Sequence, residues 1–273
     1  MAEIPNDPVH LEARLSAVQA VGSIVRALWA LSRAQLGQVD QFSREATAYL
    51  DWVDEIKERI TGPAVTHLTA AESLVVVLGP ERPFCAGLPG EVLRALPRVR
   101  HLGFVGRRLS TAAHSIAGQR ILASAEIAFE LAGPSSVHEL DDTAQALAAA
   151  IVEHGQQRPV TLFHPQVATV GLRRIDLLSE RQQPRAHFDF ESYSAYERLL
   201  EYAVRESITG NLRVALTETL RVEVRARANA AESAKRAVEK RAEALQASLR
   251  IMQQEQTTNE LAELFAGSLA PRR

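Results

Sequence analysis

The sequence predicts two long terminal helices that pair as an antiparallel coiled coil, with a Rossmann-like α/β domain inserted between them. The prolines leave two long gaps, at residues 9–62 and 185–270, and proline is poorly tolerated inside helices. Both gaps carry apolar residues at alternating steps of three and four, which is typical of a coiled-coil seam. The segment between them alternates strand-like and helix-like runs. We therefore divide the chain into an N-terminal helix (1–62), an α/β domain (63–184) and a C-terminal helix (185–273).

The N-terminal arm is predicted to be one helix over residues 8–61. Asp7 and Pro8 resemble a helix cap followed by a first-turn proline, and Gly62 with Pro63 ends the helix. Two rows of residues form the seam of this arm. They are Leu11, Val18, Val25, Ser32, Val39, Ala46, Val53 and Ile60, and Leu15, Gly22, Trp29, Leu36, Ser43, Leu50 and Lys57.

The C-terminal arm is predicted to be a helix from Ser192 to Gly267, with Gly210 as a candidate break or kink. Small alanines in its middle favour close approach of another helix. Its seam consists of Leu212, Ala215 or Leu216, Leu220, Val224, Ala230, Ala234, Val238, Ala242, Leu245, Leu249 and Met252. The N-terminal residues that we expect to face residues 230–252 of this seam are Val18, Val25, Trp29, Leu36 and Val39.

The middle of the chain is predicted to form a mostly parallel sheet with short helices. Four apolar runs are strand candidates, at residues 74–78, 102–105, 160–163 and 170–177. Helix signals lie at 88–96 and at 136–154. Asp142 and Thr143 are expected to cap the second of these helices.

The composition excludes several classes of protein. With 31 basic and 33 acidic residues the net charge is −2, which excludes a generally basic nucleic-acid binder, and we expect no nucleic-acid partner. The single cysteine excludes a disulfide or a thiolate zinc site within one chain. No run of 18 apolar residues occurs, so we expect no membrane-spanning segment. The N-terminus lacks the pattern of a secretory signal.

The sequence offers no constellation for catalysis. It lacks the Gly-Lys-Ser/Thr ending of a phosphate-binding loop, and the glycines after the first predicted strand do not give a dinucleotide fingerprint. His101 and His114 are isolated, and Cys85 is better explained as a small buried residue. Asp141 and Asp142 are better explained as helix caps than as metal ligands. We expect no catalytic residue, no cofactor and no metal.

The order of a long helix, an α/β domain and a second long helix resembles the gamma subunit of F-type ATP synthases. Several segments along the chain are similar to segments of that family. Glu81–Leu88 is similar to that family's Asp-Arg-Gly-Leu-Cys-Gly-Gly-Leu segment, and Leu102–Arg107 resembles the strand and Gly-x-Lys-Gly turn that follow it. Gln254–Leu264 resembles the family's Arg-Gln-Ala-x-Ile-Thr-x-Glu-Leu-x-Glu-Ile, with Gln254 on its Gln and Gln253 in place of its Arg. This C-terminal match is the most specific one.

The resemblance has departures besides Gln253. Arg227 and Ala228 stand where the family has Met-Lys, and only Arg26 remains of the basic turn in the first helix. These departures indicate a divergent branch, such as the alternate bacterial F-type ATPases that are proposed to pump sodium ions.

The resemblance implies a non-catalytic rotor shaft, which couples ion flow through a membrane sector to ATP synthesis or hydrolysis in a ring of alpha and beta subunits. The implied partners are these two subunits, the epsilon subunit and the membrane c-ring. The implied location is peripheral, on the cytoplasmic face of the bacterial inner membrane. By the same resemblance Gln254, Thr258, Glu260 and Leu261 contact a beta-subunit loop.

A basic stretch lies in the middle of the C-terminal arm. Residues 213–250 hold nine basic residues and five glutamates, whereas residues 251–270 hold three glutamates and no basic residue. The basic side chains either engage acidic loops of the beta subunits or form a solvated helix surface. The four that we single out are Arg225, Arg227, Lys235 and Arg236.

Other interpretations stay open at this point. The apolar tip, Leu261, Leu264, Phe265 and Leu269, either turns in a hydrophobic sleeve or packs against the N-terminal arm. The whole chain is alternatively a coiled-coil scaffold or adaptor with an α/β domain, which predicts a stable isolated dimer. A small α/β enzyme with helical arms is a third class, and it needs a pocket with convergent polar groups. Co-purification with a three-alpha, three-beta ATPase core would separate the three.

Overall fold

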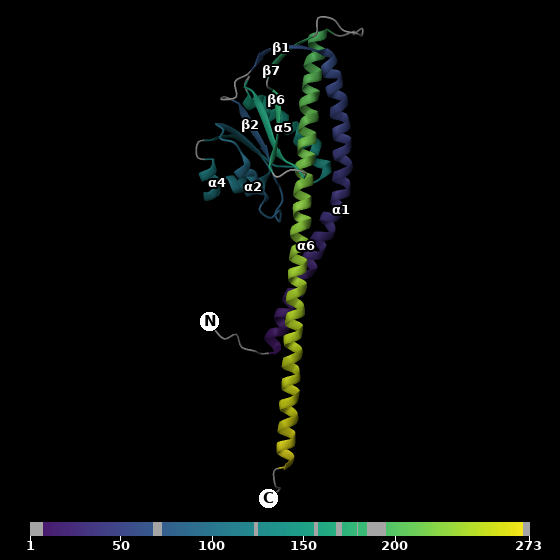
Figure 1. The fold of residues 1–273 in the computed structure, drawn as a ribbon, viewed down its shortest axis with the longest axis vertical. Coiled ribbons are helices and arrows are strands. Elements are labelled where there is room, and N and C mark those ends of the chain that lie inside the picture. The colour runs from purple at the N-terminus through teal and green to yellow at the C-terminus, as the bar shows by residue number, and fades with distance from the viewer. Residues whose placement is uncertain are drawn as a thin grey trace. The chain divides into compact units, whose positions relative to one another are not determined.

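The computed structural model describes residues 8–67, 73–122, 125–155, 158–167, 171–178, 180–184 and 195–269. Two long helices, α1 (Pro8–Ile60) and α6 (Tyr196–Leu269), flank the strands and short helices of an α/β domain in the sequence (Figure 1). The contacts divide the chain into two compact units. One consists of Met1–Leu31 with Ala228–Arg273, and the other of Ser32–Arg227. Each long helix therefore contributes to both units.

The two long helices confirm the predicted arms. Helix α1 has 53 residues and α6 has 74. In the structure α6 begins at Tyr196, and the predicted start at Ser192 lies outside the described residues. Every residue of the two predicted seam rows of α1 is buried or half-buried. The alternating spacing of three and four thus marks the face along which α1 packs.

In the unit formed by Met1–Leu31 and Ala228–Arg273, α1 and α6 run antiparallel. Gly22 is buried, and a Cβ added to it would lie 3.0 Å from Cγ1 of Val238. Further along α1, the ring of Trp29 lies against the ammonium group of Lys235, 5.1 Å from the ring centroid. Later residues of α1 therefore meet earlier residues of α6, as the prediction requires.

The same antiparallel pairing occurs within Ser32–Arg227, where Asp40 of α1 pairs with Arg221 of α6 at 2.6 Å. One part of the predicted register is wrong. Leu36 and Val39 pack in a core cluster with seam residues of Leu212–Val224 rather than with residues 230–252. The reason is the antiparallel direction itself, because each further turn of α1 meets an earlier turn of α6.

Gly210 does not break α6. The helix continues through it, and the residue is buried where α1 passes. A Cβ added there would lie 3.0 Å from Cδ1 of Leu50. The glycine therefore allows a close approach of the two helices instead of a kink.

The α/β domain contains one five-stranded sheet, with the strand order β4-β3-β2-β5-β6. Strands β2, β3, β4 and β5 run parallel, as predicted, whereas β6 pairs antiparallel with β5. After β4 the chain returns to the other side of β2, so a topological switch point lies between β2 and β5. The bounds of the strands are Leu74–Leu78 (β2), His101–Val105 (β3), Glu126–Leu131 (β4), Val160–Pro165 (β5) and Leu172–Leu178 (β6).

Helical layers cover both faces of the sheet. Leu74, Val76 and Leu78 of β2 pack in one cluster with α5 (Leu140–Gly155) and α6. The alternate residues Val75 and Val77 pack in a second cluster with α2 (Leu88–Ala95) and α3 (Arg107–Ala113). This alternation explains why β2 is apolar throughout. Helices α2 and α4 (Ile116–Ile121) lie on the side of the domain away from α6 (Figure 1).

Some elements of the domain differ from the prediction. A 3-10 turn at Val137–Glu139 precedes α5, so Asp141 and Asp142 lie in the first turn of the helix instead of capping it. Acidic side chains at this place are favoured by the helix dipole. Strand β4, helices α3 and α4, and a two-stranded antiparallel sheet of β1 (Thr61–His67) with β7 (Glu180–Pro184) were not predicted.

The apolar content of α1 bears on the expectation of no membrane-spanning segment. The helix contains an 18-residue stretch with a mean hydropathy of 1.3, which is long and apolar enough to cross a membrane by length and composition alone. Only 11% of that stretch is buried. A single such helix is weak evidence for a membrane span, because core helices and signal sequences meet the same criterion.

Candidate functional site

The residues predicted to contact a beta subunit lie on an exposed part of α6. Every side chain from Gln253 to Phe265 is exposed. Thr258 donates its hydroxyl hydrogen to the carbonyl of Gln254 at 2.8 Å, so the two residues occupy one helix face, one turn apart. Glu260 accepts a hydrogen bond from the amide of Gln256 at 3.1 Å. The polar face is therefore open to a partner.

Large apolar side chains accompany this polar face. Leu261 is 51% exposed, Leu264 71% and Phe265 69%. Of the two interpretations of the tip, packing against the N-terminal arm would bury these side chains, and the structure leaves them exposed. Clustered exposed apolar residues are typical of a surface that contacts another protein.

The four basic residues singled out from the sequence have different environments. Arg225 is exposed. Lys235 is half-buried against Trp29, and Arg236 is exposed and pairs with Glu232 at 2.6 Å. Arg227 is buried, so it cannot contribute to an exposed basic surface.

Arg227 instead forms a buried ion pair within the chain. Its Nε lies 3.7 Å from Oε1 of Glu223, one turn earlier in α6. Its Nη2 donates to Oε1 of Gln35 in α1 at 3.1 Å. Burial lowers the pKa of Arg227 and raises the pKa of Glu223, because a low-dielectric environment disfavours both charges. Through its hydrogen bond to Gln35, Arg227 links α6 to α1 instead of facing a partner.

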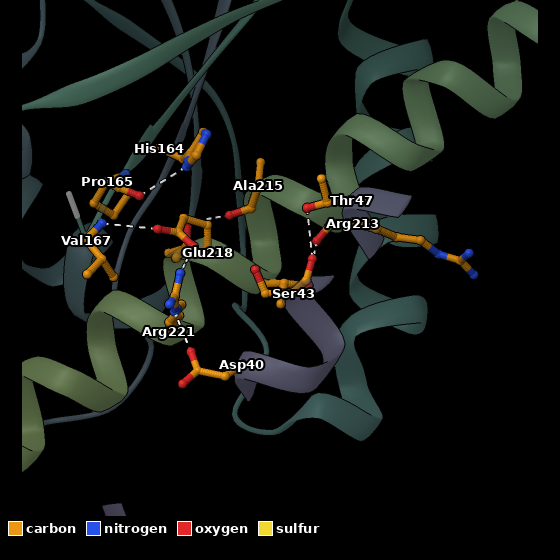
Figure 2. A network of polar contacts seen from close by, with 12 residues as sticks. Asp40, Ser43, Thr47, His164, Pro165, Val167, Arg213, Ala215, Glu218 and Arg221 are labelled. Carbon is orange, nitrogen blue, oxygen red and sulfur yellow. Dashed lines mark hydrogen bonds and ion pairs between the residues drawn. The ribbon is translucent and has the colours of Figure 1, made fainter. Parts of the chain in front are cut away.

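A second polar network joins α1, α6 and the sheet (Figure 2). Arg221 donates from Nε to Oδ1 of Asp40 at 2.6 Å and from Nη1 to Oε2 of Glu218 at 3.3 Å. Oε1 of Glu218 accepts the backbone N–H of Val167, just after β5, at 3.1 Å. Burial opposes the charge of Arg221, but Glu218 and Asp40 outweigh this effect and raise its pKa. In the sequence, Arg221 and Glu218 are two of the charged residues counted over residues 213–250. The signal for the pairing of Arg221 with Asp40 was that each residue directly follows a seam residue of its arm and that their charges are opposite.

The described residues form no catalytic constellation. They contain no group of three or more His, Cys, Asp or Glu side chains that could hold a metal ion. Cys85 is buried, and burial raises the pKa of its thiol, which disfavours the nucleophilic thiolate. His114 pairs with Glu130 at 2.6 Å, and His101 lies 3.4 Å from Glu126.

An open groove lies beside α6 at the sheet. It is lined by α2, by Pro165, Gln166, Gly171 and Leu172, and by Val222. Its lining is mainly apolar, and its charged members are Glu91 and Arg94. Arg94 donates from Nε to the carbonyl of Gly90 in its own helix.

Comparison with solved structures finds ATP synthase chains with this fold. A chain of the Euglena gracilis mitochondrial ATP synthase (OSCP/F1/c-ring, rotational state 3) has a TM-score of 0.62 and 13% identity, covering 97% of each chain. A chain of the rotor of the same enzyme in rotational state 1 has a TM-score of 0.57 and 13% identity, covering 92% of this chain and 98% of its own. A chain of the central stalk and c-ring of the Tetrahymena thermophila mitochondrial ATP synthase has a TM-score of 0.53 and 14% identity, covering 77% and 99%.

The fold and the exposed surface together define a protein that acts through contacts along a long helix pair. The family comparison is more specific, because a family model described as ATP synthase matches residues 9–270. The chain therefore belongs to the gamma-subunit family of ATP synthase, whose members form the central rotor shaft. A search of curated proteins gives no match.

Proposed function

We propose that the chain is the non-catalytic central shaft of a rotary F-type ATP synthase. In this role it couples ion flow through a membrane c-ring to ATP synthesis or hydrolysis in a ring of alpha and beta subunits, with an epsilon subunit as a further partner. It is a peripheral subunit on the cytoplasmic face of the bacterial inner membrane. The family match over residues 9–270 supports the role in general.

The observation that carries the proposal is the exposed surface of α6 from Gln253 to Phe265. It combines a polar face, which includes Gln254 and Thr258, with large apolar side chains whose exposure to water is unfavourable. An apolar sleeve formed by alpha and beta subunits would cover Leu264 and Phe265 while the helix turns inside it. Gln254, Thr258, Glu260 and Leu261 would contact a beta-subunit loop.

The shaft would act by biasing populations of states. Each beta conformation makes different contacts with an asymmetric shaft, so the shaft angle changes the nucleotide affinity of each site. By linkage, nucleotide binding changes the preferred shaft angle to the same extent. Arg225, Lys235 and Arg236 supply charges that would attract acidic loops without a fixed geometry. Because Arg227 is buried, it is left out of this surface.

Co-purification tests the proposal. The chain would be expressed with the alpha and beta subunits of its own source, purified through a tag on this chain, and analysed for stoichiometry and ATP hydrolysis. We expect one chain per three alpha and three beta subunits. A stable isolated dimer without these partners would contradict the proposal and favour the scaffold interpretation.

A further inference from the structure

A buried carboxylate ties together the loops at the carboxyl ends of three parallel strands. Glu81 follows β2 and is 8% exposed. Its Oε2 accepts the backbone N–H of Arg107, after β3, at 2.9 Å and that of Gly133, after β4, at 2.8 Å. We call this side of the sheet the carboxyl edge, defined by Glu81, by Arg107 at the start of α3, and by Gly133 and Val167, which follow β2, β3, β4 and β5.

A second buried carboxylate joins the carboxyl edge to α6. Glu223 is 1% exposed. Its Oε2 accepts the N–H of Glu81 at 2.7 Å, and its Oε1 accepts the N–H of Arg82 at 3.2 Å. Each oxygen thus has its own backbone donor, and Arg227 balances the charge from the other side. The two carboxylates form a continuous link from α6 through Glu81 to the loops after β3 and β4.

The same helix also reaches the neighbouring strand. Glu218 accepts the N–H of Val167 after β5 at 3.1 Å, and Figure 2 shows this contact beside Arg221. Glu223 and Glu218 therefore engage the loops after β2 and β5, the strands on either side of the switch point. In open α/β sheets the crevice at this position is where ligands bind. Here side chains of the chain's own helix engage the loops that border it.

These bonds add something that the apolar packing between the sheet and α6 does not supply. Hydrophobic contact is non-directional, so it resists separation better than it resists sliding. Hydrogen bonds to a carboxylate are strong and directional, and two donors on consecutive residues fix both the position and the angle of the acceptor. We propose that Glu223 is a positioning residue that locks the α/β domain to α6, so that both turn as one body when torque passes through the shaft. This proposal rests on the rotor function proposed above.

The test uses the complete ATP synthase reconstituted in vesicles with wild-type chain, Glu223→Ala, Glu223→Gln or the control Glu201→Ala. Glu201 is an exposed carboxylate of the same helix and the same unit, 3.5 Å from Arg205. The measured quantity is the ratio of ATP-driven ion pumping to ATP hydrolysis, with subunit stoichiometry checked on each sample. We expect Glu223→Ala to lower this ratio several-fold, Glu223→Gln to lower it less, and Glu201→Ala to leave it unchanged.

A second measurement reports on the lock itself. Amide hydrogen exchange at Glu81 and Arg82 should be about tenfold faster in Glu223→Ala, because a hydrogen bond to a charged group is among the stronger ones. If Glu223→Ala does not assemble, Glu223→Gln provides the deciding ratio, since it keeps an acceptor oxygen and the side-chain volume.

The outcomes separate this proposal from the rotor function. A pumping ratio equal to wild type in fully assembled Glu223 variants would overturn the lock, whether or not amide exchange changes. If the wild-type chain fails to assemble with alpha and beta subunits, the rotor function itself fails.

Discussion

Two residues after β2 have left-handed backbone although neither is glycine. The φ angle is 66° at Phe84 and 51° at Ala86, a region that costs a non-glycine residue about 1–2 kcal/mol. Between them Cys85 is buried and its thiol donates to the carbonyl of Arg82 at 3.5 Å. The buried Cys85 and the bonds from Glu223 thus keep the loop in a conformation that its own residues disfavour.

We expect Ala86→Gly to stabilise the protein. Glycine removes the left-handed penalty, and the greater freedom of the unfolded chain offsets part of the gain, which leaves about 0.5–1 kcal/mol. Chemical unfolding measures this difference. The control is Ala146→Gly at an exposed position inside α5, which should destabilise by about 1 kcal/mol. Destabilisation by both substitutions would contradict the strain argument.

His164 predicts a pH dependence of stability. Its Nδ1 lies 3.0 Å from the carbonyl of Pro165 (Figure 2), and its buried Nε2 has no hydrogen-bond partner among the described residues. Burial lowers the pKa of His164 below its usual 6.5. As the pH falls below 6.5, the unfolded chain takes up the proton before the folded chain does, so the free energy of unfolding decreases. Above pH 6.5 the contribution of neutral His164 to the free energy of unfolding is fully present.

The measurement is the free energy of unfolding between pH 5.5 and 7.5. His164→Gln should have a smaller decrease toward low pH than the wild type, whereas His138→Gln, at an exposed position, should keep the wild-type slope. Equal slopes in all three proteins would show that His164 does not cause the effect.

Gln254 and Thr258 carry the residue-level prediction for coupling. Exposed charge pairs contribute about 0–1 kcal/mol each, so a charge reversal at Arg236, which is exposed and pairs with Glu232, should change little. A hydrogen bond made in only some rotary states changes the energy of rotation. Gln254→Ala or Thr258→Ala should therefore lower ATPase turnover of the assembled complex without preventing assembly. Unchanged turnover in both variants would show that torque passes through other positions.

At the scale of elements, the long and regular ones could be predicted from the sequence. Helix α1 repeats the same spacing along its whole length, so many residues support one conclusion. Strand β4 was missed because Glu126 and Glu130 interrupt its apolar run, although three of its residues between them are half-buried. Helices α3 and α4 have seven and six residues, which is too short for a periodic pattern.

The beta-subunit contact at Gln254 and Thr258 stays a prediction. These residues were singled out by the resemblance of Gln254–Leu264 to a family segment, and their one-turn spacing places them on one helix face. The link between Glu81 and Glu223 was not found, because it joins residues 142 positions apart and no periodicity relates them. Burial of Arg227 was missed for the same reason, since its partner Gln35 lies on the other arm.

The two helical glycines Gly210 and Gly37 give a matched test of helix contact. A Cβ at Gly210 would lie 3.0 Å from Leu50, whereas nothing lies within 4 Å of one at Gly37. Gly210→Leu should destabilise by about 1–3 kcal/mol through overpacking. Gly37→Leu should stabilise by about 0.5–1 kcal/mol through helix propensity. Thermal unfolding distinguishes the two, and equal shifts would contradict the close contact at Gly210.

At the scale of the whole molecule, the helix α6 changes what the α/β domain can do. Glu223 and Glu218 bind the loops beside the switch point, and Glu81 occupies the backbone donors of Arg107 and Gly133. These backbone N–H groups at the carboxyl edge are therefore bonded to carboxylates and are not available to a phosphate. The domain keeps the strand order of a ligand-binding fold while its donors are engaged within the chain.

The full-length chain should consequently bind no nucleotide. Calorimetric titration with ATP or NAD is expected to give no binding at micromolar concentrations, because a phosphate would have to displace a buried carboxylate of the same sign. Micromolar affinity for either nucleotide would contradict this prediction.

The pairing of α1 with α6 has a consequence for the synthesis of the protein on the ribosome. The ribosome completes α1 long before it begins α6, because the entire α/β domain is made in between. At a synthesis rate of about 5–20 residues per second, the apolar seam of α1 has no partner helix for about 10 s or more. During that interval the nascent chain exposes an amphipathic helix with an uncovered apolar face. We expect the nascent chain to be a client of chaperones that bind such segments until translation ends.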